Sequence, residues 1–175
     1  MSYVYKTMTS PVGELTLVAS EAGLAAILWE HDDPRRVPIE LGAEDAHHPV
    51  LVETERQLNE YFAGRRKEFS VPLDFVCGTS FQRQVWRVLL DIPFGETRSY
   101  SDLARQIGRP NAARAVGAAN RKNPISIIGP CHRVIGASGK LTGYAGGLAA
   151  KAKLLRLEAR GAEVWGKESP VNGTE

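Results

Sequence analysis

Apolar and polar residues alternate along three stretches near the N-terminus of the chain. The stretches are Tyr3–Ser10, Glu14–Ala19 and Leu24–Trp29, and turn-forming residues separate them at 11–13 and 21–23. A period of two is typical of strands with one buried face, and short turns between such strands favour antiparallel pairing. The pattern therefore predicts an antiparallel β-meander at the start of the chain.

The period then changes to that of a helix. Residues 31–48 are rich in Pro, Asp and Glu, and we expect a loop there. Apolar residues recur at helical spacing within Leu51–Phe62, with Gly64 following as a stop signal. Residues 69–75 have an extended pattern.

The expected domain boundary lies at Cys77-Gly78. A chain of 175 residues suits one domain or two small domains that share an interface. We expect an N-terminal sheet domain, a C-terminal domain and a flexible polar tail, over residues 1–77, 78–165 and 166–175.

Three helices are expected after the boundary. Thr79 with Gln82 forms a capping box for the first helix, and residues 99–102 cap a second, short helix that stops near Gly108. A third helix is expected over Asn111–Asn120. Two short helices joined by a Gly-containing turn have the spacing of a helix-turn-helix, although many other helical pairs share it.

Most residues of the third helix have very small side chains, and Arg114 is the long exception. Its small residues include Ala113, Ala115, Gly117 and Ala118. Close helix packing also uses small residues, but arginine is an unusual choice for a buried helix contact. A minor groove is about 6 Å wide and a helix about 10 Å across, so only a face of Ala and Gly can enter a widened groove. Arg114 would then fill the gap left by an extruded base.

A cysteine and a histidine follow a short apolar run. Ile125–Ile128 predicts a buried strand that breaks at Pro130, so that Cys131 lies at the floor of a cavity and His132 can act as its base. Neighbouring strand residues point to opposite faces, so the two side chains should communicate through a bent backbone or a bridging water. Alternatively, Cys131 is only a small buried apolar residue.

Two later features add candidate chemistry. Glycines around Tyr144 free the backbone to approach a ligand, with the ring as a flat wall; a purely structural glycine turn is the alternative. The helix expected over Leu148–Arg160 carries one acid, Glu158, among basic residues. By default Glu158 is a surface ion-pair residue, but it could instead orient an imidazole in a Cys-His-acid relay.

Charge divides the chain unevenly. Residues 1–79 hold 7 Lys/Arg against 13 Asp/Glu, a net charge of −6, whereas residues 80–175 hold 15 against 7, a net charge of +8. The half that carries Cys131 is thus the basic half, as expected of a polyanion-binding domain or of a solvated basic face.

The composition also excludes several classes of protein. Two cysteines form no disulfide framework, no metal-ligand spacing occurs, and no apolar run is long enough for a membrane span. We expect no metal, no cofactor and no membrane contact. The expected location is the cytoplasm, or the nucleus in a eukaryotic host.

A series of motifs follows in order between Thr79 and Gly161. They are Phe-Gln-Arg-Gln-Val-Trp (81–86), Ile-Pro-Phe-Gly-Glu-Thr (92–97), Ala-Ala-Arg-Ala-Val-Gly (112–117), Pro-Cys-His-Arg-Val-Ile-Gly (130–136) and Leu-Thr-Gly-Tyr-Ala-Gly-Gly (141–147). In this order they resemble the methylated-DNA–protein-cysteine methyltransferases, the O6-alkylguanine-DNA alkyltransferase family. The N-terminal third is similar only in its strand pattern.

The resemblance implies a fold and a function. The fold is α+β, with a ribonuclease-H-like N-terminal antiparallel β-sheet domain packed on a helical, winged-helix-like DNA-binding domain that contains the helix-turn-helix. The function is DNA repair by direct reversal, in which Cys131 irreversibly takes the alkyl group of a flipped O6-alkylguanine in a single turnover. The partner is double-stranded DNA carrying this lesion, bound by a monomer. Activity on O4-alkylthymine and cooperative assembly on DNA stay open.

The resemblance also implies roles at the reaction centre. Cys131 would be the alkyl acceptor and His132 its water-mediated base. Glu158 would orient His132, and Asn123 would brace the loop behind the cysteine. Tyr100 would donate a proton towards guanine N3.

Other residues would bind the DNA and the base. Arg114 would replace the flipped nucleotide. Backbone groups near Cys131, Val134 and Ala145 would read the guanine edge, and Tyr144 would flank the alkyl group.

Two positions depart from the family pattern. Gly129 replaces a branched aliphatic residue and would loosen the pocket floor, while Arg121-Lys122 would add phosphate contacts.

Other functions remain as alternatives. The strongest is a non-catalytic module that senses alkylated DNA without repairing it. A Cys-His-Glu acyl-transfer enzyme and a plain helix-turn-helix regulator are less consistent with the stripped third helix.

Overall fold

The structure is a computed structural model that describes residues 3–167. From residue 168 onward, the predicted flexible tail lies outside the described residues. The last helix, α5 (Leu148–Lys167), continues past the predicted end at Arg160.

The N-terminal meander is confirmed. Strands β1 (Tyr3–Ser10), β2 (Gly13–Ala19) and β3 (Leu24–Trp29) pair antiparallel in sequence order. The alternation of apolar and polar residues reflects burial, because Leu15 and Leu17 of β2 are buried on the core face of the sheet.

The segment predicted as a loop contains a fourth strand, so the loop prediction over residues 31–48 is wrong in part. Strand β4 (Leu41–Glu44) pairs parallel with β1 and lies at the edge of a sheet of order β3-β2-β1-β4. The sheet is therefore mixed rather than antiparallel throughout. All four residues of β4 are exposed, so no apolar alternation marks this strand in the sequence.

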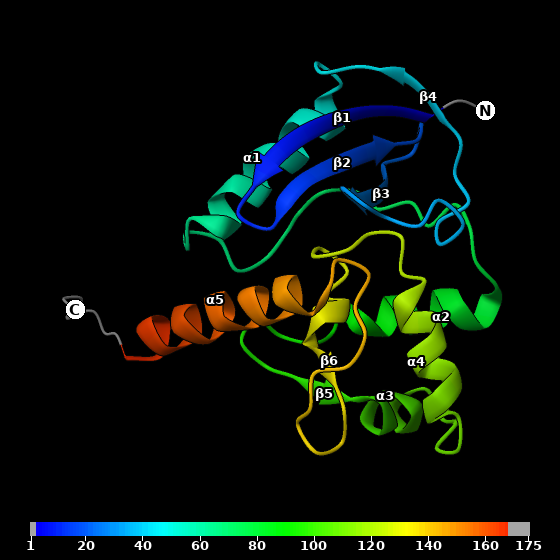
Figure 1. Ribbon diagram of the computed structural model, residues 1–175, viewed down its shortest axis with the longest axis vertical. Coiled ribbons are helices and arrows are strands. Elements are labelled where there is room, and N and C mark those ends of the chain that lie inside the picture. The colour runs from blue at the N-terminus through cyan, green and yellow to red at the C-terminus, as the bar shows by residue number, and fades with distance from the viewer. Residues whose placement is uncertain (1–2, 168–175) are drawn as a thin grey trace.

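Helix α1 (Pro49–Phe62) covers the sheet, as Figure 1 shows. Leu51, Leu58 and Tyr61 are its large buried side chains, at the helical spacing the sequence predicted. His48 Nδ1 accepts from the Val50 N–H at 3.2 Å and caps the first turn.

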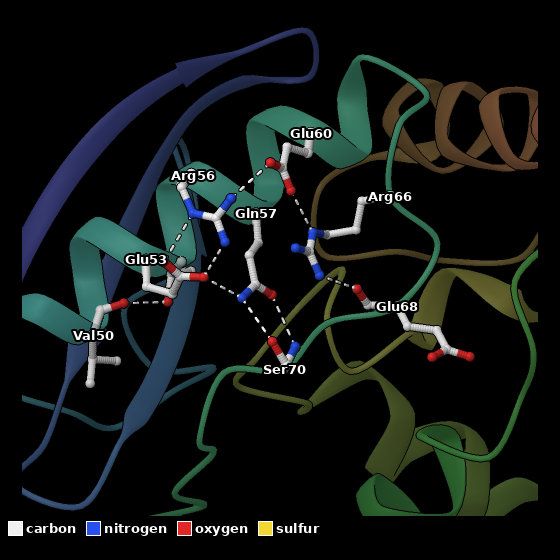
Figure 2. Close-up of polar contacts among 9 residues, drawn as sticks. Val50, Glu53, Arg56, Gln57, Glu60, Arg66, Glu68 and Ser70 are labelled. Carbon is white, nitrogen blue, oxygen red and sulfur yellow. Dashed lines mark hydrogen bonds and ion pairs between the residues drawn. The ribbon is translucent and has the colours of Figure 1, made fainter.

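Polar side chains of α1 hold the segment that connects the two halves of the chain (Figure 2). Gln57 bonds to Ser70 twice, through Nε2 to Oγ at 3.0 Å and from the Ser70 N–H to Oε1 at 2.9 Å. Arg66 donates to Glu60 at 2.8 Å. The chain that leaves α1 is therefore tied back onto it before it enters the second half.

The C-terminal half is mostly helical, and both predicted capping boxes are present. Its two short strands pair parallel with each other. Below the sheet in Figure 1, these elements lie to the right of and beneath the starting end of α5, which extends to the left. They are α2 (Ser80–Leu89), β5 (Arg98–Ser99), α3 (Tyr100–Gln106), α4 (Ala113–Arg121), the 3₁₀ helix η1 (Cys131–Arg133) and β6 (Val134–Ile135).

The predicted strand at Ile125–Ile128 is wrong. Ile125 makes a single bridge to Ile27 of β3, and the chain then turns, with the Gly129 N–H donating to the Ile125 carbonyl at 2.8 Å. Ile127 has φ 74°. The apolar run is buried as expected, but its backbone is satisfied by a tight local turn rather than by a ladder.

One apolar cluster joins the two halves. It contains Leu15, Ile27 and Tyr61 from the sheet layer together with Ile125 and Leu154 from the C-terminal half. The α+β class with an N-terminal sheet and C-terminal helices is confirmed. Among residues 3–167, no helix has the length and apolar content that a membrane span requires.

Candidate active site and nucleic-acid interface

Cys131 is the first residue of η1 and is only 4% exposed. Its N–H donates to the Gly129 carbonyl at 2.7 Å, and Asn120 Nδ2 donates to its carbonyl at 3.4 Å. Burial raises the pKa of the thiol, while Asn123, Arg36 and Lys151 oppose that rise. The resting sulfur is therefore a thiol that needs a base.

His132 follows Cys131 in η1, so the expectation of a bent backbone rather than a strand at this point is met. Its Nε2 lies 2.7 Å from Glu158 Oε2, and both side chains are buried. Burial lowers the pKa of His132, while Glu158 opposes this. A neutral imidazole facing a carboxylate carries its proton on Nε2, which leaves Nδ1 as the basic nitrogen. Within the described chain, His132 Nδ1 is buried and has no hydrogen-bond partner.

Glu158 is not the surface ion-pair residue that the default interpretation expected. It is 1% exposed and accepts from Arg133 Nε at 2.8 Å, Arg133 Nη2 at 2.9 Å and the Tyr61 hydroxyl at 2.6 Å. Burial opposes ionisation of Glu158, but His132 and Arg133 outweigh it and lower its pKa to about 2. Glu158 is thus a carboxylate held by several donors.

Asn123 links the chain on both sides of the turn before Cys131. Its Nδ2 donates to the Gly129 carbonyl at 2.9 Å, and its Oδ1 accepts from the Ile125 N–H at 3.1 Å. A Cβ placed on Gly129 would lie 2.8 Å from the Ile125 carbonyl oxygen. The turn is closed tightly around Gly129, so a larger side chain would require the backbone to shift; that this glycine loosens the pocket floor stays a prediction.

Tyr100 begins α3, and its hydroxyl is hydrogen-bonded to Thr142 Oγ1 in the glycine-rich segment. Gly117 of α4 faces the ring, since a Cβ there would lie 3.6 Å from Tyr100 Cδ1. Tyr100 therefore stands between α4 and the segment that carries Tyr144.

Of the three predicted pocket residues, Val134 and Tyr144 pack in one cluster with the cysteine. Val134 is fully buried and packs in the same apolar cluster as Cys131, with Tyr144 against it. The Tyr144 hydroxyl is buried without a partner among the described residues, and its ring lies 5.5 Å edge-on from Trp29 of β3. Ala145 is half-buried against the larger apolar cluster.

Helix α4 divides its residues between two faces. Val116, Ala119 and Asn120 are buried, whereas Arg114, Ala115 and Ala118 are exposed and Ala113 and Gly117 are half-buried. Arg114 is thus the one long side chain on the stripped outer face between residues 113 and 118. The helix–turn–helix arrangement pairs α4 with α3.

Sequence reasoning missed several residues that hold this site. Arg133 lies within a motif, but the sequence did not predict its hydrogen bond to Glu158. Nor did it predict the bond that Arg133 donates to the Ile92 carbonyl at 2.6 Å. Arg36, in the predicted loop, donates to the Asn123 carbonyl at 2.8 Å. Lys151 is fully buried and donates to the Thr142 carbonyl at 3.2 Å. For Arg133 and Lys151, a basic residue within or shortly after a motif was the signal that the sequence offered, whereas Arg36 in the predicted loop had none.

No group of three or more metal-ligating side chains occurs in the described part of the chain. The donors around Cys131 are consistent with proton transfer between thiol, imidazole and carboxylate.

Two family models match successive parts of the chain. The ribonuclease-like domain of 6-O-methylguanine DNA methyltransferase matches residues 3–75, and the DNA binding domain of the same family matches residues 80–160. A methylated-DNA–protein-cysteine methyltransferase from Mycolicibacterium paratuberculosis is 51% identical over 156 residues, covering 89% of this chain and 92% of the relative. The chain belongs to the methylated-DNA–protein-cysteine methyltransferase family.

Solved structures of this family share the fold. The Mycobacterium tuberculosis O6-methylguanine methyltransferase is 51% identical, with a TM-score of 0.79 over 90% of this chain and 93% of that one. A structure of the M. tuberculosis protein in complex with DNA is 49% identical, with a TM-score of 0.76 over 92% and 94% of the two chains. Membership of the methyltransferase family thus rests on sequence and on fold, and the predicted resemblance is confirmed.

Proposed function

We propose that this chain repairs DNA by transferring the alkyl group of O6-alkylguanine to Cys131, once per protein molecule. The observation that carries the proposal is the buried series Cys131, His132 and Glu158 beneath helix α4, whose exposed residues between 113 and 118 are small except for Arg114. The family relatives are named for transfer from methylated DNA to a protein cysteine, and one relative is solved with DNA.

The chemistry begins with the thiol proton. Nδ1 of His132 takes the proton from Cys131 through a bridging water, and the imidazolium that forms is stabilised by Glu158. The thiolate attacks the saturated carbon on O6, so that a sulfur–carbon bond forms as the carbon–oxygen bond breaks. The departing guanine gains a proton from the Tyr100 hydroxyl towards N3.

The product explains the single turnover. The sulfur now holds a thioether, which has no carbonyl for water to attack, unlike the acyl-enzyme of a cysteine hydrolase. Hydrolysis therefore does not regenerate the thiol.

The DNA would approach along the outer face of α4. Ala115 and Ala118 are exposed there and allow that face into a widened minor groove, Ala113 and Gly117 are half-buried beside them, and Arg114 supports the gap left by the flipped base. Flipping costs a few kcal/mol, which stacking in the pocket and phosphate contacts offset. The excess of basic residues in the C-terminal half favours such contacts.

Mass spectrometry tests the proposal. The protein is mixed with a duplex that contains O6-methylguanine, and the expected result is one added methyl group on Cys131 with guanine restored in the DNA. Binding without any adduct would instead indicate the alkylated-DNA sensor. Turnover beyond one equivalent would contradict the single-use acceptor. The monomeric state and the cytoplasmic location stay predictions.

A further inference from the structure

Tyr61 is a buried side chain of the N-terminal domain that reaches the reaction centre. Its hydroxyl donates to Glu158 Oε2 at 2.6 Å, across 97 residues of sequence. The same oxygen lies 2.7 Å from His132 Nε2. The two domains therefore meet on one carboxylate oxygen, and none of the motifs around Cys131 includes this tyrosine.

Aromatic packing fixes the direction of that hydroxyl. The Tyr61 ring lies 5.5 Å from Phe69 and 6.3 Å from Phe94, between the connecting segment and the loop after α2. A ring held on several sides presents its hydroxyl in one place. Tyr61 is thus a fixed donor rather than an adaptable one.

Three donors share Glu158 Oε2, namely Tyr61, His132 and Arg133. A carboxylate oxygen that already accepts other hydrogen bonds holds an imidazolium proton less strongly. Loss of one donor would leave the carboxylate less neutralised, so that it would interact more strongly with its remaining partners, including protonated His132.

We propose that Tyr61 is a positioning residue of the reaction centre: it holds the Glu158 carboxylate and limits how strongly that carboxylate favours protonated His132. The inference deepens the alkyl transfer proposed above and rests on it for its functional meaning. The N-terminal domain would thereby keep His132 available as a base.

The surrounding charges are consistent with this role. His132 faces Glu158 and Lys151 from α5 and Arg133 from its own element. Glu158 faces His132, Arg133 and Tyr61. Burial, followed by the charge of Glu158, raises the pKa of Tyr61 well above its usual value, so the hydroxyl remains a donor through the neutral range.

The first test is the titration of His132 in the free protein, followed by NMR. The chain has four histidines, and the signal of His132 is identified as the one that is lost in His132→Gln. Tyr61→Phe should raise the pKa of His132 by about half a unit to one unit, as expected when a carboxylate loses one of several donors. Thr54→Val is the matched control, because it removes another buried hydroxyl of α1, which donates to the Val50 carbonyl at 2.7 Å within its own helix. The control should leave the titration unchanged.

The second test is the rate of single methyl transfer at saturating DNA. Tyr61→Phe should slow transfer several-fold at pH 6 and little at pH 8, because more His132 is protonated at the lower pH. A residue that only stabilises the fold would lower the rate by one factor at both values. In a Glu158→Gln background, the effect of Tyr61→Phe on His132 should vanish.

The outcomes separate the two proposals. An unchanged His132 titration in Tyr61→Phe, in a protein that still transfers methyl groups, overturns the positioning role alone. A shifted titration in a protein that accepts no methyl group overturns the proposed function alone. If Tyr61→Phe does not fold, the inference is tested in the wild-type protein by NMR. The Tyr61 hydroxyl proton should exchange slowly with solvent, and its chemical shift should change as His132 titrates. A chemical shift that stays constant during this titration refutes the inference.

Discussion

Arg133 and Glu158 form a buried two-pronged ion pair, and Arg133 lies in the same 3₁₀ helix as Cys131. Arg133 Nε lies 2.8 Å from Oε1, and Nη2 lies 2.9 Å from Oε2. Both side chains are almost inaccessible to solvent. Because the two hydrogen bonds fix the plane of the carboxylate, the oxygen that faces His132 has one orientation.

Glu158→Gln should destabilise the protein. The substitution keeps the shape of the side chain but leaves the Arg133 charge buried without a counter-charge, which costs about 3 to 5 kcal/mol. Chemical denaturation measures the change. Glu96→Gln removes an exposed ion pair with Arg98 and should stay within about 1 kcal/mol of wild type. Equal losses in the two variants would contradict the importance of the buried pair.

The same carboxylate should make the fold sensitive to acid. The pKa of Glu158 is lowered from 4.5 to about 2 in the folded state, so its stabilising effect is fully present above pH 4.5. That contribution should disappear as the pH falls from 4.5 towards 2, because the unfolded chain takes up the proton first. The free energy of unfolding, measured between pH 6 and pH 3, should fall more steeply in wild type than in Glu158→Gln. Parallel slopes would show that another group is responsible.

The elements that the sequence predicted are those whose signals are local. The β1–β3 meander shows alternation because one face of each strand is buried, and the capping boxes at Thr79 and Ser99 need only four consecutive residues. Strand β4 gave no such signal, because its pairing with β1 is a backbone contact at an exposed edge. The run at Ile125–Ile128 was correctly expected to be buried, but a buried run does not distinguish a ladder from a turn.

The candidate site was predictable only in part for the same reason. Cys131 and His132 are neighbours in sequence, and the family resemblance implied a role for Glu158, which lies outside the quoted motifs. Tyr61 and Arg36 reach the site from the N-terminal half, and neither contact follows from a local period or motif. Such long-range partners are chosen by the packing of the two halves, which single-sequence patterns do not contain.

Arg114→Ala should impair base flipping more than general DNA binding. Arg114 is exposed on the outer face of α4, so its removal leaves the fold intact. Loss of its support for the gap should slow methyl transfer at saturating DNA about 10- to 100-fold, equivalent to about 1 to 3 kcal/mol. Affinity for undamaged duplex should fall only a few-fold.

Arg121→Ala is the matched control for Arg114→Ala. Arg121 is also exposed and ends α4, and its side chain should contact phosphate. Its loss should weaken binding and reduce the salt dependence by about one unit of slope, with little effect on the transfer rate at saturation. Equal effects of the two substitutions on rate and affinity would count against a special role for Arg114.

Ala118→Leu should block the approach of α4 to DNA without disturbing the fold. Ala118 is exposed on the stripped face, and leucine is a good helix former, so stability should be unchanged or slightly higher. The added side chain would hold the helix away from the floor of a groove about 6 Å wide. Binding to a lesion duplex should weaken at least tenfold, measured by fluorescence anisotropy. Ala159→Leu places the same change at an exposed position of α5 and should leave binding intact. If Ala118→Leu bound as tightly as Ala159→Leu, α4 would not be the surface that enters the groove, and the small residues on it would need another explanation.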